Sequence, residues 1–307
     1  MKLPVVYTIQ RYMKAALILV SVLVCATTAR AGLLYSALRQ DTWNIYFQAN
    51  LTSEPEIVTE TIAGDKNASA LSPNGRSIAF EVQCIGIYVC LIGSLSKCLL
   101  IRPKGGTAVR PTWHPVTGKL LFVRYLADGT KEDADIFVTR NSLTEMDMLI
   151  EQTGIQDYPD VSPDGRLLAY TSSHTISVHR SGVQVVQQLW IMNLETGVAR
   201  QLILGNAQDI QPDWSPSGQQ IAFASNRNGQ FDIWVVNADG KDLRQITSGS
   251  GAKTWPAWSP GGKSIMFTLL KNGNYSLWII NVDGTNLRSF EPFGSGAKIE
   301  LRDADWR

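Results

Sequence analysis

The chain has 307 residues, of which 44% are hydrophobic and 18% are charged, and its formal net charge is +1. This composition is that of a folded protein, and it excludes a disordered chain. The 28 basic and 27 acidic residues nearly balance, and no basic stripe or arginine-rich arm occurs, so the sequence lacks the electrostatic footprint of a nucleic-acid-binding protein.

The N-terminal segment has the features of a secretory signal. Basic residues precede an apolar run over residues 15–26, and residues 29–31 form a small-x-small cleavage site. The apolar run is shorter than the roughly 20 residues that a membrane span requires. We therefore predict a signal peptide over residues 1–31 and a periplasmic or extracellular protein. The alternative is an uncleaved N-terminal segment, which would be the chain's one link to a membrane.

After the signal, one unit of four short strands, here called A to D, recurs six times. Strand B ends in an aromatic residue, and strand C reads polar–aliphatic–aromatic–aliphatic. The six C strands are expected at residues 44–47, 86–89, 135–138, 188–191, 232–235 and 276–279. In five units a turn with Pro and Gly joins strands A and B, because Pro presets φ and Gly supplies a positive φ.

The spacing of these turns predicts the architecture. The turn prolines from Pro73 to Pro260 are 42, 48, 53 and 44 residues apart, and four strands at that period are typical of propeller blades. The mature chain begins in a B strand near Leu33, whereas residues 303–307 resemble an A strand without its own B. We therefore predict an all-β, six-bladed β-propeller of four-stranded blades over residues 32–307, closed by the C-terminal strand.

Three cysteines of the mature chain, Cys84, Cys90 and Cys98, lie in one repeat. Export permits a disulfide. Centring the hairpin near Ser94 places Cys90 opposite Cys98, so these two can form a cross-strand bridge. Three buried, reduced cysteines are an equally good interpretation of the same pattern.

Residues 212–218, 221–223 and 232–240 resemble the repeat of the TolB-type propellers, which are also called PD40 or WD40-like, and residues 158–165 resemble it equally well. The resemblance spans the mature chain. It implies an exported six-bladed propeller that binds other proteins. TolB also has an α/β domain before its propeller, for which this chain has no room, so the resemblance does not carry over the Tol–Pal role. Related propellers precede the hydrolase domain of prolyl-oligopeptidase-like peptidases, but this sequence has no Gly-x-Ser-x-Gly elbow.

The B–C and D–A loops fall on one side of a propeller, and the A–B and C–D turns fall on the other. The B–C loops differ most in length among the six units, and variable loops on a rigid scaffold are the usual place for recognition. We therefore expect a protein or peptide partner on that face. Candidate binding residues are Arg39, Arg124, Asp128, His174, His179, Arg180, Arg227, Asn228, Lys271 and Asn272 from the B–C loops, and Asp157, Asp209 and Trp255 from the D–A loops.

These features predict a non-catalytic binding protein without a cofactor or a metal. His114 is expected at an A–B turn, whereas His174 and His179 are expected in a long B–C insertion of the fourth unit, so the three histidines should not converge on one metal. The alternative function is a lyase or hydrolase that acts on a saccharide in the central channel. A third interpretation is a structural module of a larger envelope complex.

Overall fold

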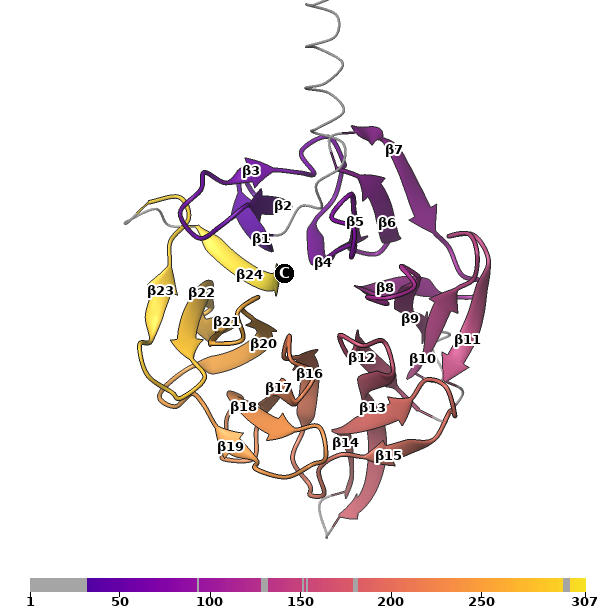
Figure 1. Ribbon diagram of the computed structural model, residues 1–307, viewed down its shortest axis with the longest axis vertical. Helices are drawn as coiled ribbons and strands as arrows, with labels where there is room; N and C mark the ends of the chain where they lie inside the picture. Colours follow the sequence, from indigo (N-terminus) through magenta and orange to yellow (C-terminus); the bar gives the residue numbers. More distant parts are fainter. Residues whose placement is uncertain are drawn as a thin grey trace, which may run out of the picture. The chain divides into compact units, whose positions relative to one another are not determined.

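The computed structural model describes residues 32–92, 94–127, 132–150, 152, 154–178, 182–294 and 299–307. Within these residues, six antiparallel sheets of four strands surround a central axis (Figure 1). No helix in this part of the chain is long and apolar enough to cross a membrane. The predicted signal peptide lies outside the described residues.

Each sheet is one blade, and its four strands follow one another outward from the channel in the order A, B, C and D. Blade 1 contains β24 (Glu300–Trp306), β1 (Leu33–Arg39), β2 (Thr42–Gln48) and β3 (Glu56–Ile57). Blade 2 contains β4 (Lys66–Leu71), β5 (Ser77–Val82), β6 (Gly86–Leu91) and β7 (Ser94–Ile101). Blade 3 contains β8 (Thr107–Trp113), β9 (Leu120–Ala127), β10 (Glu132–Thr139) and β11 (Met146–Ile150).

The second half of the ring repeats this plan. Blade 4 contains β12 (Gln156–Val161), β13 (Leu167–Val178), β14 (Gly182–Asn193) and β15 (Ala199–Gln201). Blade 5 contains β16 (Asp209–Trp214), β17 (Gln220–Ser225), β18 (Asp232–Asn237) and β19 (Arg244–Gln245). Blade 6 contains β20 (Ala252–Trp258), β21 (Ser264–Lys271), β22 (Asn274–Asn281) and β23 (Arg288–Phe290).

The ring is closed by a strand from the far end of the chain. β24 pairs with β1 in an antiparallel register that places Leu33 opposite Trp306 and Ala37 opposite Leu301. The backbone N–H of Arg307 also donates to the carbonyl oxygen of Gly32 at 2.9 Å. The predicted six-bladed propeller and its closure by the C-terminal strand are therefore confirmed.

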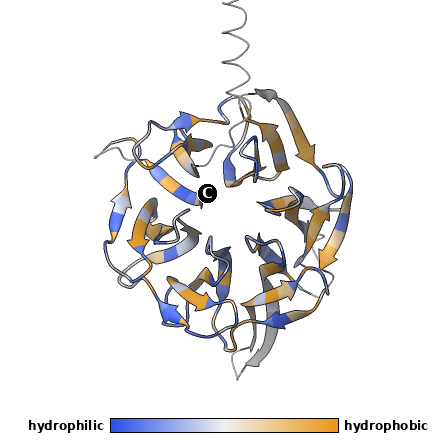
Figure 2. Ribbon diagram, viewed as in Figure 1, coloured by the Kyte–Doolittle hydropathy of each residue, from blue (hydrophilic) through white to orange (hydrophobic). Residues whose placement is uncertain are grey.

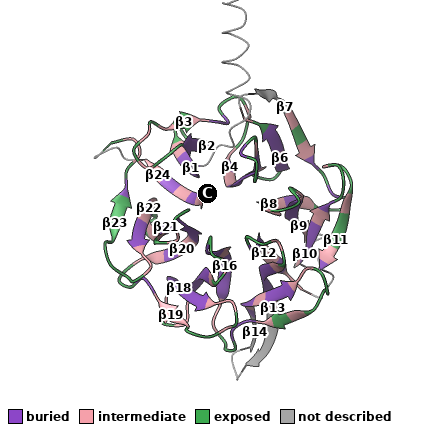
Figure 3. Ribbon diagram, in the orientation of Figure 1, coloured by how far each residue is buried: buried purple, intermediate pink, exposed green. Residues whose placement is uncertain are grey.

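The apolar core lies between the blades. The aromatic residues predicted for strands B and C face each other, as in the stacked pair of Phe122 and Phe137, whose centroids are 5.8 Å apart. Each described apolar cluster joins two neighbouring blades; one contains Ile87 of blade 2 and Phe122 of blade 3. Hydrophobic and buried residues therefore concentrate along the strands (Figures 2 and 3). A single blade could not bury both faces, so the repeat requires neighbours.

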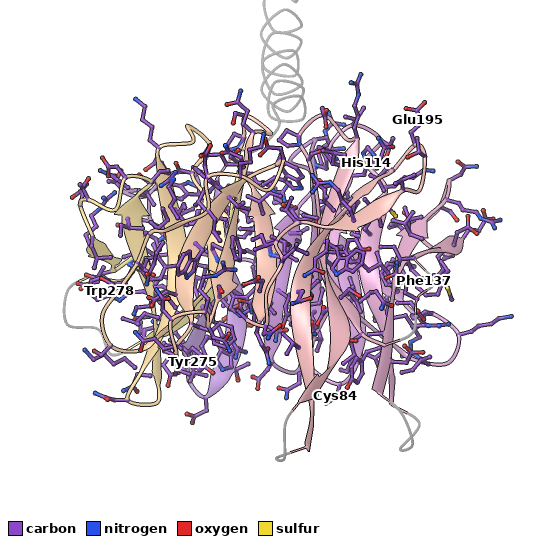
Figure 4. The ribbon with its side chains drawn as sticks, turned by 90° about the horizontal axis from the view of Figure 1, so that it is seen from below. Cys84, His114, Phe137, Glu195, Tyr275 and Trp278 are labelled. Carbon is purple, nitrogen blue, oxygen red and sulfur yellow. A yellow bond between two sulfur atoms is a disulfide. The ribbon has the colours of Figure 1, made fainter. Side chains whose placement is uncertain are left out.

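The two ends of the blades form opposite faces of the ring. In the side view, His114 of an A–B turn and Glu195 of a C–D turn lie on one face, whereas Cys84 and Tyr275 of B–C hairpins lie on the other (Figure 4). We call them the turn face and the loop face. The insertion predicted in blade 4 continues the hairpin instead of forming an irregular loop, because β13 and β14 pair from Leu167 opposite Asn193 to Val178 opposite Gly182.

Blade 2 carries the cysteines. Cys90 on β6 and Cys98 on β7 are joined by a disulfide, and Cys84 is free and exposed. The cross-strand bridge is thus the arrangement of the structure, one of the two that the sequence left open.

Candidate functional site

The central channel is lined by the six A strands, and each of these strands bulges once. The register against strand B shifts at the same place in every blade. At that place one non-glycine residue has a φ between 44° and 58°. Such a φ is uncommon outside glycine, and a bulge turns the side chain away from the regular alternation of a strand. These residues, here called the bulge ring, are Ala68, Arg110, Tyr158, Gln211, Trp255 and Asp303.

Proline follows the bulge residue in four of the six blades. Arg110, Tyr158, Gln211 and Trp255 are each followed by proline. Proline has no N–H to donate and cannot continue the ladder of a sheet. The chain therefore leaves the regular pairing there, and the residue before the proline is directed toward the channel.

Three members of the bulge ring from different blades contact one another. The Arg110 guanidinium lies 4.6 Å from the ring centroid of Tyr158 and 5.1 Å from that of Trp255. The two rings meet edge to face, 5.4 Å apart and inclined by 74°. Arg110 Nη2 also donates to the Tyr158 hydroxyl at 3.2 Å. We call these three residues the aromatic–arginine cluster.

Two acidic side chains near Arg110 stabilise its positive charge. Its Nε lies 3.5 Å from Asp157 Oδ1, and its Nη1 lies 4.0 Å from Glu81 Oε2. Burial opposes the charge of Arg110, but Asp157, Tyr158 and Glu81 outweigh burial and raise the pKa of its guanidinium. The cluster therefore keeps a permanent positive charge between two aromatic rings, an arrangement stabilised by cation–π attraction.

A second ring of side chains lies nearer the turn face. Asp160, Asp213 and Asp305 come two residues after the bulge in their strands, and each accepts a hydrogen bond from a backbone N–H of the next blade, at 2.7–2.8 Å. Arg307 lies among them, with its Nε 2.8 Å from Asp305 and its Nη2 3.5 Å from Asp160. We call the three aspartates the carboxylate ring.

Burial has the largest effect on the pKa values of Asp160 and Asp213. It raises the pKa of Asp160 to about 6, although Arg307 opposes the rise. It also raises the pKa of Asp213 well above its ordinary value, and the nearby Asp160 adds to the increase. Conversely, Asp305 and the other carboxylates raise the pKa of Arg307. Asp160 and Asp213 therefore take up a proton more readily than exposed aspartates do, beside the charged guanidinium of Arg307.

Two cavities of the channel meet at the carboxylate ring. One, of about 110 Å³, is lined by the bulge ring, which lies on the loop side of the carboxylate ring because the A strands start on the loop face. The other, of about 300 Å³, is lined by turn prolines such as Pro163 and Pro216 and lies toward the turn face. Both cavities share Asp160, Asp213, Asp305 and Arg307, which therefore form the partition between them.

Among the residues predicted to bind a partner, Trp255 lies in the channel as a member of the bulge ring. Asp157 forms an ion pair with Arg110, which in turn contacts Trp255. Lys271 and Asn272 are exposed at the tip of the β21–β22 hairpin, and Asn272 adopts a φ of 53° there. Arg39 is exposed at the end of β1, with its guanidinium 5.0 Å from the ring centroid of Phe293.

Other predicted residues have partners within their own blade. Arg124 pairs with Asp135 at 2.6 Å, and its guanidinium lies 4.7 Å from the Phe137 ring. Arg227 pairs with Asp209 at 2.8 Å. Asn228 Nδ2 donates to Gln245 Oε1 at 2.7 Å. His174 lies on β13 opposite Val186. Asp128, His179 and Arg180 lie outside the described residues.

The sequence reasoning missed Arg110, Tyr158 and Leu204. A sequence signal for Arg110 and Tyr158 was available. A proline follows the equivalent residue of strand A in four blades. Leu204 lies in the loop between β15 and β16, on the loop face, and 85% of its surface is exposed. For metals, no group of three or more His, Cys, Asp or Glu side chains is gathered for binding in the described part of the chain.

Comparison with known proteins gives the family of the repeat. Residues 181–297 match the family model described as the TolB beta propeller domain, PD40. The chain is also 32% identical, over 71 residues, to the uncharacterized peptidase YuxL of Bacillus subtilis (strain 168). That stretch is 23% of this chain and only 10% of the relative, so the chain spans about a tenth of the curated protein that it matches.

Solved structures extend the likeness to the whole ring. A putative TolB from Agrobacterium tumefaciens matches with a TM-score of 0.63 and 17% identity, over 91% of this chain and 98% of that one. TolB from Acinetobacter baumannii matches with a TM-score of 0.70 and 18% identity, over 90% of this chain and 66% of that one. An oligogalacturonate lyase solved with manganese matches with a TM-score of 0.59 and 14% identity, over 85% and 74%. Given the ring of six four-stranded blades, the chain is a six-bladed β-propeller, and residues 181–297 of it match the TolB beta propeller domain.

Proposed function

We propose that the chain is an exported, non-catalytic propeller that binds a protein or peptide partner on its loop face. The observation that carries the proposal is the aromatic–arginine cluster. It brings Arg110, Tyr158 and Trp255 together from three blades on the loop side of the channel. Tyr, Trp and Arg are the residue types that dominate the centres of protein interfaces.

The size of the channel cavity supports a peptide side chain as the ligand. A volume of about 110 Å³ corresponds to the share of roughly four water molecules. Pockets for small-molecule ligands are usually about 300–1,000 Å³. A single anchoring side chain fits the smaller volume, and the rest of the partner would then contact the rim, where Leu204, Lys271 and Asn272 are exposed.

Export is part of the proposal. The N-terminal 31 residues have the pattern of a secretory signal. The Cys90–Cys98 disulfide suits an oxidising compartment outside the cytoplasm. Sequencing the N-terminus of the secreted or periplasmic protein tests this point, and a chain that starts at Met1 in the cytoplasm would contradict it.

Cys84 offers a direct test of the face. It is free, exposed and on the loop face, so a thiol-reactive photo-crosslinker attached there reports on a partner bound to that face. We expect cross-linked species with components of the exported fraction. The matched control is the double variant Cys84→Ser, Glu195→Cys, which carries the same probe on the turn face. A partner that cross-links only from position 195 would contradict the proposal.

A second variant tests the cluster itself. Trp255→Ala removes one of the two rings that contact Arg110, and we expect it to reduce cross-linking from Cys84 by roughly tenfold or more, as for the loss of an interface anchor. Circular dichroism checks that the variant still folds as a propeller. Unchanged cross-linking by a folded Trp255→Ala protein would remove the cluster from the proposal.

The alternative is a saccharide-acting lyase or hydrolase. Its support is the likeness of fold to the oligogalacturonate lyase solved with manganese. Elemental analysis of the purified protein, together with an assay for cleavage of oligogalacturonate, separates the two functions. A stoichiometric transition metal with turnover would favour the enzyme over the binding protein.

A further inference from the structure

Two blade interfaces contain a similar polar cluster around a buried lysine. In the copy between blades 5 and 6, the lysine forms an ion pair with an aspartate. Lys253 Nζ lies 2.9 Å from Asp232 Oδ1, and the two side chains are 5% and 3% exposed. The Thr247 hydroxyl donates to the same carboxylate oxygen at 2.9 Å and accepts from the N–H of Ile233 at 2.8 Å. The buried ammonium is therefore neutralised by a buried carboxylate.

The copy between blades 1 and 2 lacks that carboxylate. Thr59 and Lys66 occupy the positions of the threonine and the lysine, but Asn44 replaces the aspartate. The Thr59 hydroxyl donates to Asn44 Oδ1 at 3.2 Å and accepts from the N–H of Ile45 at 2.9 Å. Lys66 Nζ donates to the same amide oxygen at 3.0 Å. The hydrogen bonds are kept, but the negative charge is missing.

Lys66 is consequently a buried cation without an ion-pair partner. Only 1% of its surface is exposed, and no carboxylate of the described residues lies within 4.0 Å of its Nζ. Burial lowers the pKa of its ammonium, and the neighbouring Asp65 only partly opposes this. A buried charge is stable when it is paired, and an ammonium has three donors, of which Asn44 accepts one.

Lys66 also lines a cavity of about 530 Å³ under the β1–β2 hairpin, on the loop side of blade 1. Arg39, Thr42 and Glu60 line the same cavity. Arg39 supplies a second positive charge, and Glu60 is exposed at its edge. This volume lies within the range of small-molecule pockets. The cavity therefore combines room for a ligand with a buried ammonium that has no carboxylate within 4.0 Å among the described residues.

We propose that this cavity binds a small carboxylate ligand, which neutralises the Lys66 ammonium as Asp232 neutralises that of Lys253 in the equivalent cluster. The carboxylate accepts a hydrogen bond from Lys66 Nζ, and the Arg39 guanidinium stands at the rim of the same cavity. A hydrogen bond between two charged groups is shorter and stronger than a neutral one. The carboxylate belongs either to a free organic acid or to the end of a peptide chain. The site is separate from the aromatic–arginine cluster and does not depend on the proposed function.

Matched ligands test the charge requirement. We would titrate the purified protein at pH 7 with acetate, with N-acetylglycine and with the neutral N-acetylglycinamide, using calorimetry and thermal unfolding at constant ionic strength. The expected result is a saturable rise in melting temperature with the carboxylates and none with the amide. Saturation by acetate identifies a free acid as the ligand class, and binding by N-acetylglycine alone identifies a chain terminus. The absence of any carboxylate-dependent shift would overturn the proposal.

Two variants locate the effect. Asn44→Asp supplies the missing carboxylate from the chain itself and recreates the Asp232–Lys253 arrangement, so it should fold and bind the carboxylates roughly tenfold or more weakly. Lys66→Met removes the ammonium and should lose the response as well. Carboxylate binding that persists unchanged in a folded Asn44→Asp protein would show that Lys66 is not the site.

Discussion

Asp213 and Trp258 hold neighbouring blades together by a reciprocal pair of hydrogen bonds. The Asp213 carboxylate accepts from the backbone N–H of Trp258 at 2.7 Å, and the indole Nε1 of Trp258 donates to the carbonyl oxygen of Asp213 at 3.1 Å. Asp160 and Trp214 form the same pair one interface earlier. The recurrent Asp and Trp residues of the repeat therefore connect neighbouring blades.

Removing this connection should loosen one interface. Asp213→Ala deletes the acceptor and leaves the Trp258 N–H unpaired, so we expect a loss of about 1–3 kcal/mol in the free energy of unfolding. Asp239→Ala, in an exposed C–D turn, is the control and should change stability by less than about 0.5 kcal/mol. Urea titration measures both. Equal stability of the two variants would contradict the structural role of Asp213.

The carboxylate ring should make stability depend on pH in a definite direction. Burial raises the pKa of Asp160 to about 6, above the value of about 3.9 in an unfolded chain, so the folded state binds the proton more tightly. The stabilisation that this proton gives is complete below pH 4 and is lost as the pH rises through about 6. Asp160→Asn mimics the protonated side chain and should lack this loss.

Urea midpoints of the wild type and of Asp160→Asn between pH 4 and pH 7 check this prediction. The wild type should lose stability relative to the variant as the pH rises across that range. Parallel curves for the two proteins would show that Asp160 does not titrate within it.

The exposed apolar side chains offer a matched pair for the partner face. Leu204 lies on the loop face and is 85% exposed, whereas Val198 lies in a C–D turn on the opposite face and is 68% exposed. We expect Leu204→Ser to weaken partner binding by roughly tenfold, because burying a leucine is worth about 1.5–3 kcal/mol. Val198→Ser should leave binding unchanged. Surface plasmon resonance with the cross-linked partner measures both, and the reverse ranking would place the partner on the turn face.

The disulfide should contribute to stability. Cys90 and Cys98 are eight positions apart in the sequence, and closing so short a loop restricts the unfolded chain by about 2.5 kcal/mol in the chain-entropy account. The double variant Cys90→Ser, Cys98→Ser should lose about that much in denaturant titration. Cys84→Ser, which removes the free and exposed thiol, is the control and should leave the midpoint unchanged.

The buried ion pair of Asp232 and Lys253 should be sensitive to loss of the carboxylate charge. Asp232→Asn keeps an acceptor for Lys253 but removes its counter-charge, and we expect a loss of about 2 kcal/mol because the ammonium stays buried. Asn44→Asp should change stability in the opposite direction. Thermal unfolding of both variants in a carboxylate-free buffer provides the measurement. A loss of stability in Asn44→Asp would mean that Lys66 is not short of a counter-charge.

The repeat made the fold predictable because the periodic aromatic and turn residues determine which surfaces each blade must bury. The candidate site was harder to predict from the sequence. Trp255 was among the predicted residues, but Arg110 and Tyr158 were not, because only the bulge of each A strand places the three together. Arg124 and Arg227 were expected to face a partner, whereas the structure pairs them with Asp135 and Asp209. A sequence does not show which long side chains fold back onto their own blade.

The pairing of β24 with β1 completes the channel. Asp303, Asp305 and Arg307 all belong to the segment that closes the ring, so neither ring of channel side chains is complete before that segment docks. Contacts between distant parts of a chain form slowly because a long loop must be closed first. Until then β1 has an open edge that invites mispairing with other strands. Closure of the channel therefore requires the first and the last described strands of the chain to meet.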